Sequence, residues 1–216
     1  MLSRQEYLAA WSRWHGNADT DSGLVRRWLS VGYALARPLA GLPPVVVTAA
    51  GLAAAGAAVL PAAAGGAWLV AAGLLVGVSG LLDSLDGALA IGTGRASRRG
   101  FVLDSAVDRL TEGGYAAALW MAGAPGPLAV AFGALCWLPD YLRARAGQAG
   151  VSETGALSVW ERPTRVIVTG LTLSGAGVLA AVEVHGPVVP VGTAAGVLLG
   201  AVAVGQLGVW LRRALG

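Results

Sequence analysis

The sequence has little of what a water-soluble protein carries at its surface. Only 12% of its 216 residues are Asp, Glu, Lys or Arg, which is about half the share in soluble globular domains. Lysine is absent, so all 15 basic residues are arginine, and the 12 acids leave a formal net charge of +3. That surplus is too small to indicate nucleic-acid binding. The composition argues against a soluble protein.

Cysteine and histidine are also scarce. The single cysteine, Cys136, excludes an internal disulfide and has no partner for a thiolate metal site. The two histidines, His15 and His185, lie far from each other and from the acidic residues along the sequence. A histidine-based metal or nucleophilic site is therefore not expected.

Long apolar stretches dominate the rest of the chain. Each is about long enough to cross a bilayer as a helix, and they cover residues 44–60, 67–90, 101–122, 126–142, 164–183 and 187–210. The loops between them are alternately rich in arginine and free of it, which places both termini in the cytoplasm and favours an even number of spans. The sequence predicts an all-α integral membrane protein with six transmembrane helices, multi-pass in the cell's inner (plasma) membrane.

The first 40 residues differ from the rest. They lack an apolar core behind a basic start, so a cleaved signal peptide is not expected. Between Asp21 and Arg37 apolar residues recur at helical spacing with the arginines displaced from them, a pattern typical of an interfacial amphipathic helix. Trp11 and Trp14 extend this anchor; the alternative is a solvated tail. We expect an interfacial segment over 1–40 and a six-helix transmembrane domain over 41–216.

Four aspartates mark the cytoplasmic ends of two neighbouring spans. Asp83 and Asp86 lie near the end of the second apolar stretch, and Asp104 and Asp108 near the start of the third. Because a short loop joins the two helices, they run antiparallel and present the carboxylates to one another at one membrane depth. Four carboxylates there require compensation, and all-oxygen ligation favours Mg²⁺, Mn²⁺ or Ca²⁺.

Such a set suffices for a pair of cations about 3.5–4 Å apart, which would bind a diphosphate and stabilise an in-line phosphoryl displacement. The alternative is a set of helix-capping or ion-paired acids with Arg95, Arg98 and Arg99 as partners.

These residues resemble a known signature, that of the CDP-alcohol phosphotransferase family. Seven of its eight positions fit, in the pattern Asp83-x2-Asp86-Gly87-x2-Ala90-Ile91-x8-Gly100-x3-Asp104-x3-Asp108. The departure is Ile91, where the family usually has arginine. The segment 41–51 is similar to the start of the family's first helix, with Val45 in place of its asparagine. The resemblance implies a generally dimeric membrane enzyme with six transmembrane helices, in which an alcohol displaces CMP from a CDP-linked donor.

The resemblance also implies residue roles. Asp83, Asp86, Asp104 and Asp108 would bind Mg²⁺ or Mn²⁺, two ions per active site, and Asp108 would also be the catalytic base for the acceptor hydroxyl. The CDP-linked donor would be bound by Thr48, Asp83, Gly87, Ala90, Arg95 and Gly100. Arg95, one helical turn beyond Ile91, is expected to replace the missing arginine.

Arginines around the loop between the fourth and fifth spans suit a phosphate dianion. They are Arg143, Arg145, Arg162 and Arg165, and the alternative is topology-setting charge at the headgroups. This region is similar to the phosphatidylinositol-phosphate synthase branch of the family, apart from Gly147, where that branch usually has an acid. The expected reaction transfers a phosphatidyl group from CDP-diacylglycerol to a phosphorylated polyol, inositol phosphate first, glycerol 3-phosphate or phosphatidylglycerol next.

Two other functions are weighed against this transferase. A small cation transporter or channel would also place acids in the membrane, but here they gather near one face and the other half is nearly all Ala, Gly, Leu and Val. A catalytically inactive member of the family would account for Ile91 and Val45, although all four acids of the signature are present. We therefore expect a metal-dependent transferase, a homodimer with its active site facing the cytoplasm.

Overall fold

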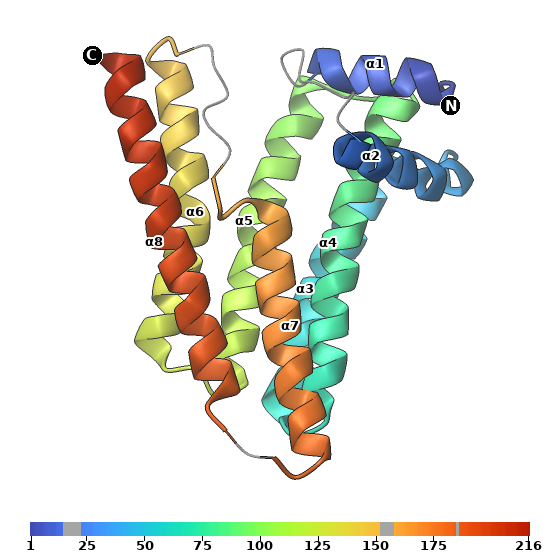
Figure 1. Cartoon of the computed structure of the whole chain (residues 1–216). Helices are drawn as coiled ribbons and strands as arrows, with labels where there is room; N and C mark the ends of the chain where they lie inside the picture. Colours follow the sequence, from blue (N-terminus) through green and yellow to red (C-terminus); the bar gives the residue numbers. More distant parts are fainter. Residues whose placement is uncertain (15–22, 152–157, 185) are drawn as a thin grey trace. The chain divides into compact units, whose positions relative to one another are not determined.

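The computed structural model describes residues 1–14, 23–151, 158–184 and 186–216. Within these ranges the chain is all-helical, with eight α-helices and one short 3-10 helix (Figure 1). His15, Asp21 and His185, which the sequence singles out, lie outside the described residues. In chain order the elements are α1 (Arg4–Trp14), α2 (Gly23–Ala36), η1 (Arg37–Leu39), α3 (Pro44–Ala64), α4 (Trp68–Gly92), α5 (Arg98–Met121), α6 (Gly126–Gln148), α7 (Arg162–Ala181) and α8 (Val188–Leu215).

Helices α3 to α8 form at the six apolar stretches. Four of them, α3, α4, α7 and α8, are long and apolar enough to cross a bilayer, so the chain is a multi-pass membrane protein. By the same measure of length and hydropathy, α5 and α6 fall short, because both carry several charged residues. Six spans therefore stay a prediction, with four supported by helix length and composition.

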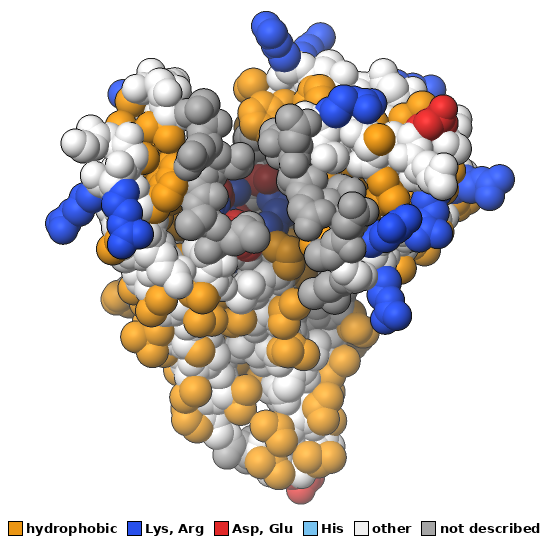
Figure 2. All heavy atoms as spheres, turned by 45° about the horizontal axis from the view of Figure 1, so that its top comes forward, with side chains coloured by type: hydrophobic (Ala, Val, Ile, Leu, Met, Phe, Trp, Pro, Cys, Tyr) orange, Lys and Arg blue, Asp and Glu red, His pale blue; other side chains and the backbone are white. Residues whose placement is uncertain are grey.

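Large apolar side chains cover the outside of the long helices. Leu60, Val130, Leu171 and Leu198 are each at least 66% exposed. Figure 2 shows orange hydrophobic side chains over much of the visible surface, with blue arginine side chains standing out from it. Exposed apolar surface on this scale would associate in water, whereas lipid tails solvate it.

The chain divides into two compact units that are discontinuous in sequence. Unit 1 comprises Met1–Leu52 and Ser79–Asp108, and unit 2 comprises Ala53–Val78 and Arg109–Gly216. Helices α3, α4 and α5 each contribute residues to both units. The predicted division into residues 1–40 and 41–216 is a different one, because unit 1 groups the N-terminal helices with parts of these three helices.

In unit 1 the N-terminal helices pack together and against the end of α4. The rings of Tyr7 and Tyr33 lie 5.3 Å apart between centroids, and the Tyr33 hydroxyl donates to the Leu2 carbonyl oxygen at 2.8 Å. The Leu2 amide donates to the Gly92 carbonyl oxygen at 2.7 Å, so the start of the chain satisfies a carbonyl at the end of α4. Helix α1 thus lies across the ends of α4 and α5 (Figure 1).

Helix α2 forms within the stretch for which the sequence predicts an amphipathic helix, but the residues that it buries are not those of the predicted apolar stripe. Leu29 and Ala36 are buried in the core of unit 1, while Val31 and Leu35 remain exposed on the outer side. Arg26 is exposed as well. A helix that buries one apolar face and exposes another apolar strip beside arginine suits the boundary between headgroups and acyl chains.

Unit 2 is held by close helix packing at glycines. A Cβ added at Gly200 of α8 would lie 2.7 Å from the Leu135 Cβ of α6, and one at Gly177 of α7 would meet the α4 backbone at Val70. The Trp160 ring is fully buried and packs edge-on against Phe132, with centroids 5.5 Å apart. Because small residues let helix backbones approach closely in a membrane, these contacts fix the helices that carry the arginines described below.

Candidate active site

The four aspartates of the signature lie where α4 ends and α5 begins, within unit 1. Helix α4 ends in a Schellman-type turn, in which the Arg95 amide donates to the Ala90 carbonyl oxygen at 2.8 Å and Gly94 takes a positive φ of 69°, a conformation that glycine adopts without strain. Ser97 then caps α5, since its Oγ accepts from the Gly100 amide at 3.0 Å. This compact connection turns the chain back and sets the two carboxylate-bearing segments antiparallel.

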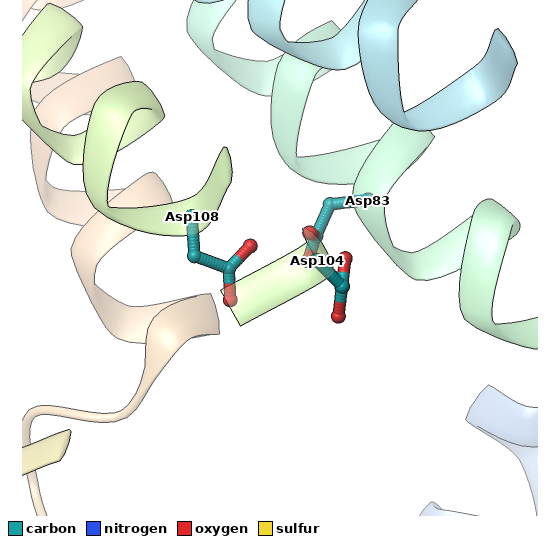
Figure 3. A group of neighbouring side chains, drawn as sticks. All are labelled: Asp83, Asp104 and Asp108. Carbon is teal, nitrogen blue, oxygen red and sulfur yellow. The ribbon is translucent and has the colours of Figure 1, made fainter. Parts of the chain in front are cut away.

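Three of the aspartates converge. Asp83 of α4 and Asp104 and Asp108 of α5 each offer a carboxylate oxygen, and these oxygens all lie within 4.8 Å of one another. Figure 3 shows the three side chains directed toward a common region. Two oxygens bound to one Mg²⁺ at about 2.1 Å lie no more than about 4.2 Å apart, so small side-chain adjustments would bring the three onto one ion. We call these three residues the acid group.

Asp86, the fourth predicted ligand, is not in the acid group. Asp86 is only 4% exposed, and its carboxylate lies within reach of the Thr48 side chain of α3. Among the described residues, no hydrogen-bond donor reaches its buried Oδ2. A buried carboxylate oxygen of this kind carries a desolvation cost, which a cation could offset. The donor set, all carboxylate oxygen, fits Mg²⁺ or Mn²⁺.

The predicted donor-binding residues lie in the same unit. Thr48 donates to the Pro44 carbonyl oxygen at 3.1 Å, and Gly87 is exposed, with open space where a Cβ would stand. Ala90 is half-buried and Gly100 is exposed, but an added Cβ at Gly100 would lie 3.1 Å from the Ser97 Oγ. Gly87 is therefore the position where the backbone leaves most room for a ligand.

Ile91 and Arg95 account for the departure from the signature in structural terms. Ile91 is 8% exposed and belongs to the apolar core of unit 1 with Tyr7, Leu8 and Leu29. A guanidinium at this position would have to be buried among apolar side chains. Arg95 is exposed, and its guanidinium donates to the Leu42 carbonyl oxygen at 2.9 Å, which ties the turn after α4 to the segment before α3.

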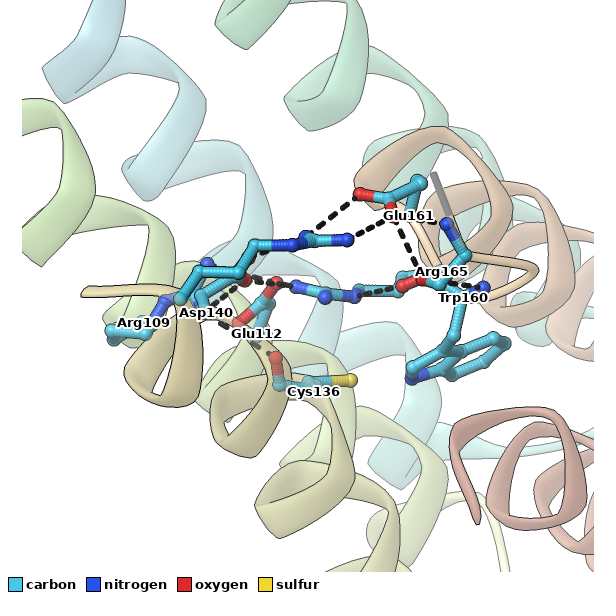
Figure 4. Close-up of polar contacts among 9 residues, drawn as sticks. Arg109, Glu112, Cys136, Asp140, Trp160, Glu161 and Arg165 are labelled. Carbon is cyan, nitrogen blue, oxygen red and sulfur yellow. Dashed lines mark hydrogen bonds and ion pairs between the residues drawn. The ribbon is translucent and has the colours of Figure 1, made fainter. Parts of the chain in front are cut away.

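A second polar cluster lies in unit 2 (Figure 4). It joins three helices and the residue before α7 through hydrogen-bonded ion pairs, and its members are Arg109 and Glu112 of α5, Asp140 and Arg143 of α6, Glu161, and Arg165 of α7. We call these six residues the ion-pair network. It contains three arginines and three carboxylates, so its formal charges balance.

Arg165 and Glu112 form the buried centre of the ion-pair network. Their side chains are 1% and 0% exposed, and the guanidinium donates to Glu112 Oε1 at 2.5 Å and to Asp140 Oδ2 at 2.9 Å. The Arg165 Nε also donates to the Trp160 carbonyl oxygen at 2.9 Å. These ion pairs and hydrogen bonds offset the cost of burying the two charges, although Glu112 Oε2 is buried without a hydrogen-bond partner among the described residues.

The segment before α7 is fixed by Glu161. Its Oε1 accepts from the Ser158 amide at 2.8 Å and from the Arg143 guanidinium at 2.6 Å. Burial acts to raise the pKa of Glu161, but the hydrogen bonds from Arg143 and Ser158 outweigh it and hold the pKa below its ordinary value. Glu161 is thus an ionised partner for Arg143.

The four predicted acceptor arginines have three different kinds of surroundings. Arg143 and Arg165 belong to the ion-pair network, and Arg162 lies close enough to Glu112 to act on it electrostatically. Arg145 is exposed and donates to the Gln148 side chain instead. The sequence reasoning missed Glu112, Asp140 and Glu161 as partners of these arginines, and it missed Arg109 as a further arginine of the network. The available signal was their position, since charged residues within membrane helices rarely lie without a partner.

The comparisons with known proteins agree on the family. A family model described as CDP-alcohol phosphatidyltransferase matches residues 42–202. A phosphatidylinositol phosphate synthase of Mycolicibacterium smegmatis is 37% identical over 157 residues, which cover 66% of this chain and 68% of that protein. An archaetidylinositol phosphate synthase of Aeropyrum pernix is 40% identical over 113 residues, 50% of this chain and 58% of that protein. The chain thus matches little more than half the length of this archaeal relative.

Solved structures give the same fold. The chain is similar to the crystal structure of Mycobacterium tuberculosis phosphatidylinositol phosphate synthase with CDP-diacylglycerol bound, with a TM-score of 0.70, 28% identity, and coverage of 87% of this chain and 96% of that one. A second structure of that enzyme, in complex with manganese and citrate, matches with a TM-score of 0.69 and 29% identity over 86% of this chain and 90% of that one.

Proposed function

Because the chain belongs to the CDP-alcohol phosphatidyltransferase family, we propose that it transfers a phosphatidyl group from CDP-diacylglycerol to a hydroxyl of inositol phosphate and releases CMP. The observation that carries this proposal is the convergence of Asp83, Asp104 and Asp108, three acids of the family signature, within 4.8 Å. The names of the bacterial and archaeal relatives support the choice of acceptor, and the bound CDP-diacylglycerol of the mycobacterial structure supports the donor.

The donor's diphosphate belongs at the acid group. Bound Mg²⁺ or Mn²⁺ would supply the positive charge that offsets the donor phosphates during the displacement. Asp83, Asp104 and Asp108 hold the cation, with Asp86 as the fourth predicted ligand. Gly87 leaves room for the nucleotide, and Thr48, Ala90, Arg95 and Gly100 are the other residues that we assign to the donor.

The displacement itself needs one base and no covalent intermediate. The acceptor hydroxyl oxygen forms a bond to the β-phosphorus of CDP-diacylglycerol, and the bond from that phosphorus to the oxygen of CMP breaks. The hydroxyl proton passes to the carboxylate of Asp108, the residue that we assign as the general base.

The acceptor's phosphate belongs at the arginines of unit 2. We assign it to Arg143, Arg145, Arg162 and Arg165, with Arg143 and Arg165 held in place by carboxylate partners. Bidentate guanidinium groups suit a phosphate dianion. Asp108 and Arg109 are successive residues of α5, so one helix carries both the proposed base and a member of the ion-pair network.

We propose that both termini and the active site lie on the cytoplasmic side of the membrane, in a protein of six spans that forms a homodimer. The alternation of arginine-rich and arginine-free loops supports the orientation, and the resemblance to the family supports the dimer.

An acceptor panel tests the function. The purified protein, reconstituted in lipid nanodiscs with CDP-diacylglycerol and Mn²⁺ or Mg²⁺, is given inositol phosphate, glycerol 3-phosphate, phosphatidylglycerol or serine, and both CMP and the lipid product are measured. We expect the largest rate of CMP release with inositol phosphate and none after EDTA treatment. Turnover that persists without divalent metal contradicts the mechanism. A larger rate of CMP release with glycerol 3-phosphate or phosphatidylglycerol would identify that compound, and not inositol phosphate, as the acceptor.

A further inference from the structure

Asp140 lies at the meeting point of three guanidinium groups. Its Oδ2 accepts from Arg109 at 2.6 Å and from Arg165 at 2.9 Å, and its Oδ1 accepts from Arg143 at 3.3 Å. These arginines come from α5, α7 and α6, and Figure 4 shows the Asp140 side chain between Arg109 and Arg165. One carboxylate therefore takes the position toward which three helices direct positive charge.

Asp140 is nevertheless the most accessible member of the ion-pair network. Its side chain is 36% exposed, compared with 27% for Glu161 and 0% for Glu112. Among the described residues, its carboxylate receives hydrogen bonds from guanidinium groups alone. Glu161, by contrast, is also held by the Ser158 amide and hydroxyl. Asp140 is thus the acid whose contacts a soluble anion could take over.

We propose that Asp140 is an internal anion that competes with the acceptor's phosphate for Arg109, Arg143 and Arg165. Guanidinium forks bind carboxylate and phosphate by the same paired hydrogen bonds, and a phosphate dianion brings twice the charge of the carboxylate. This inference rests on the proposed function and assigns Asp140 a specificity-determining role in it. A phosphate dianion displaces the carboxylate, whereas an uncharged alcohol such as unphosphorylated inositol does not.

A positioning role for Asp140 predicts the opposite result. If the carboxylate holds the three arginines in the geometry that phosphate needs, its removal loosens them and weakens phosphate binding. If it competes, its removal frees up to three hydrogen-bond donors and takes a repelling charge from the site. The sign of the change in phosphate affinity therefore decides between the two roles.

The experiment uses inorganic phosphate and the variant Asp140→Asn, which keeps the shape and removes the charge. The midpoint of thermal denaturation of the purified protein is measured against phosphate concentration at constant ionic strength. We expect the apparent phosphate affinity of D140N to be about tenfold higher than that of the wild type, since a unit charge a few ångströms away is removed. Asp140→Glu, which keeps the charge, should bind phosphate about as the wild type does, and so should Glu183→Gln, which removes an exposed carboxylate outside the network.

The kinetic counterpart is a fall in the KM for inositol phosphate in D140N with the KM for CDP-diacylglycerol unchanged. Weaker or unchanged phosphate binding in D140N overturns the proposal, and so does a D140N protein that fails to fold, because a residue that must stay in place cannot be displaced. Phosphate binding does not depend on turnover. If no acceptor supports CMP release but D140N binds phosphate more tightly, the proposed function is wrong and the competition stands.

Discussion

The acid group and the ion-pair network solve the problem of charge in membrane helices in opposite ways. In the acid group, carboxylates from α4 and α5 face one another within 4.8 Å. In the ion-pair network, every carboxylate accepts from at least one guanidinium, and three acids balance three arginines. Like charges close together raise the energy of the site unless a cation joins them. The converging carboxylates of the first cluster suit the cation-binding role that we propose for it, whereas the ion pairs of the second cluster join α5, α6 and α7.

The sharpest test of this comparison is the loss of an acid-group carboxylate. We expect Asp104→Asn and Asp108→Asn each to lower the rate of CMP release about a thousandfold or more, because a metal ligand, and in the second case also the base, is lost. The measurement is the initial rate at saturating Mn²⁺, with Glu183→Gln as the control that loses a carboxylate elsewhere. Either variant retaining more than a tenth of the wild-type rate would remove that residue from the machinery.

For stability we expect the ion-pair network to matter more than the acid group. Glu112→Gln should lower the free energy of unfolding by about 3 kcal/mol, because it leaves the buried Arg165 guanidinium without its ionised partner. Asp83→Asn in metal-free protein should cost little or even stabilise, because it relieves repulsion within the acid group. Chemical denaturation of both variants in the same detergent measures the two effects. A larger loss in Asp83→Asn than in Glu112→Gln would show that the acid group, not the network, is the structural element.

The sequence predicts the acid group better than the network because the two depend on different distances along the chain. Asp83, Asp104 and Asp108 are brought together by helical spacing and by one turn at Gly94, all of which are local. Arg165 and Glu112 lie 53 positions apart, and nothing in helical periodicity specifies that pair. The arginines were identifiable by type, but their partners depend on how α5, α6 and α7 pack.

The helices likewise differ in whether local sequence or tertiary packing determines them. Their positions follow from the apolar stretches, so α3 to α8 form where the sequence predicts them. For the residues of helix α1 the sequence predicts only that Trp11 and Trp14 belong to a membrane anchor. The role of the helix depends on tertiary contacts, such as the hydrogen bond from the Leu2 amide to the Gly92 carbonyl oxygen. The core position of Ile91 is likewise set by packing against Tyr7 and Leu29 of the N-terminal helices, which the signature alone does not reveal.

The smallest expected effect concerns two ionised glutamates outside the long helices. Hydrogen bonds hold the pKa of Glu161 below its ordinary value of 4.5 despite burial, and hydrogen bonds with Ser3 lower the pKa of Glu6 at the start of α1. A lowered folded-state pKa contributes stability that is present above about pH 4.5 and is lost as the pH falls through the folded-state value. For the partly buried Glu161 pair this contribution is about 1 kcal/mol or less.

The measurement is the free energy of unfolding between pH 6 and pH 3 for the wild type, Glu161→Gln and Glu6→Gln. The difference between wild type and Glu161→Gln should shrink as the pH falls below 4.5, and salt should reduce it only slightly, because Arg143 and Glu161 are largely shielded, at 18% and 27% exposure. The effect of Glu6→Gln should be smaller, because Glu6 is exposed to water and counterions. If the difference in the free energy of unfolding between wild type and Glu161→Gln stays constant with pH, the shape and not the charge of Glu161 fixes the segment before α7. Ion pairing would then contribute less to the stability of the network than its geometry indicates.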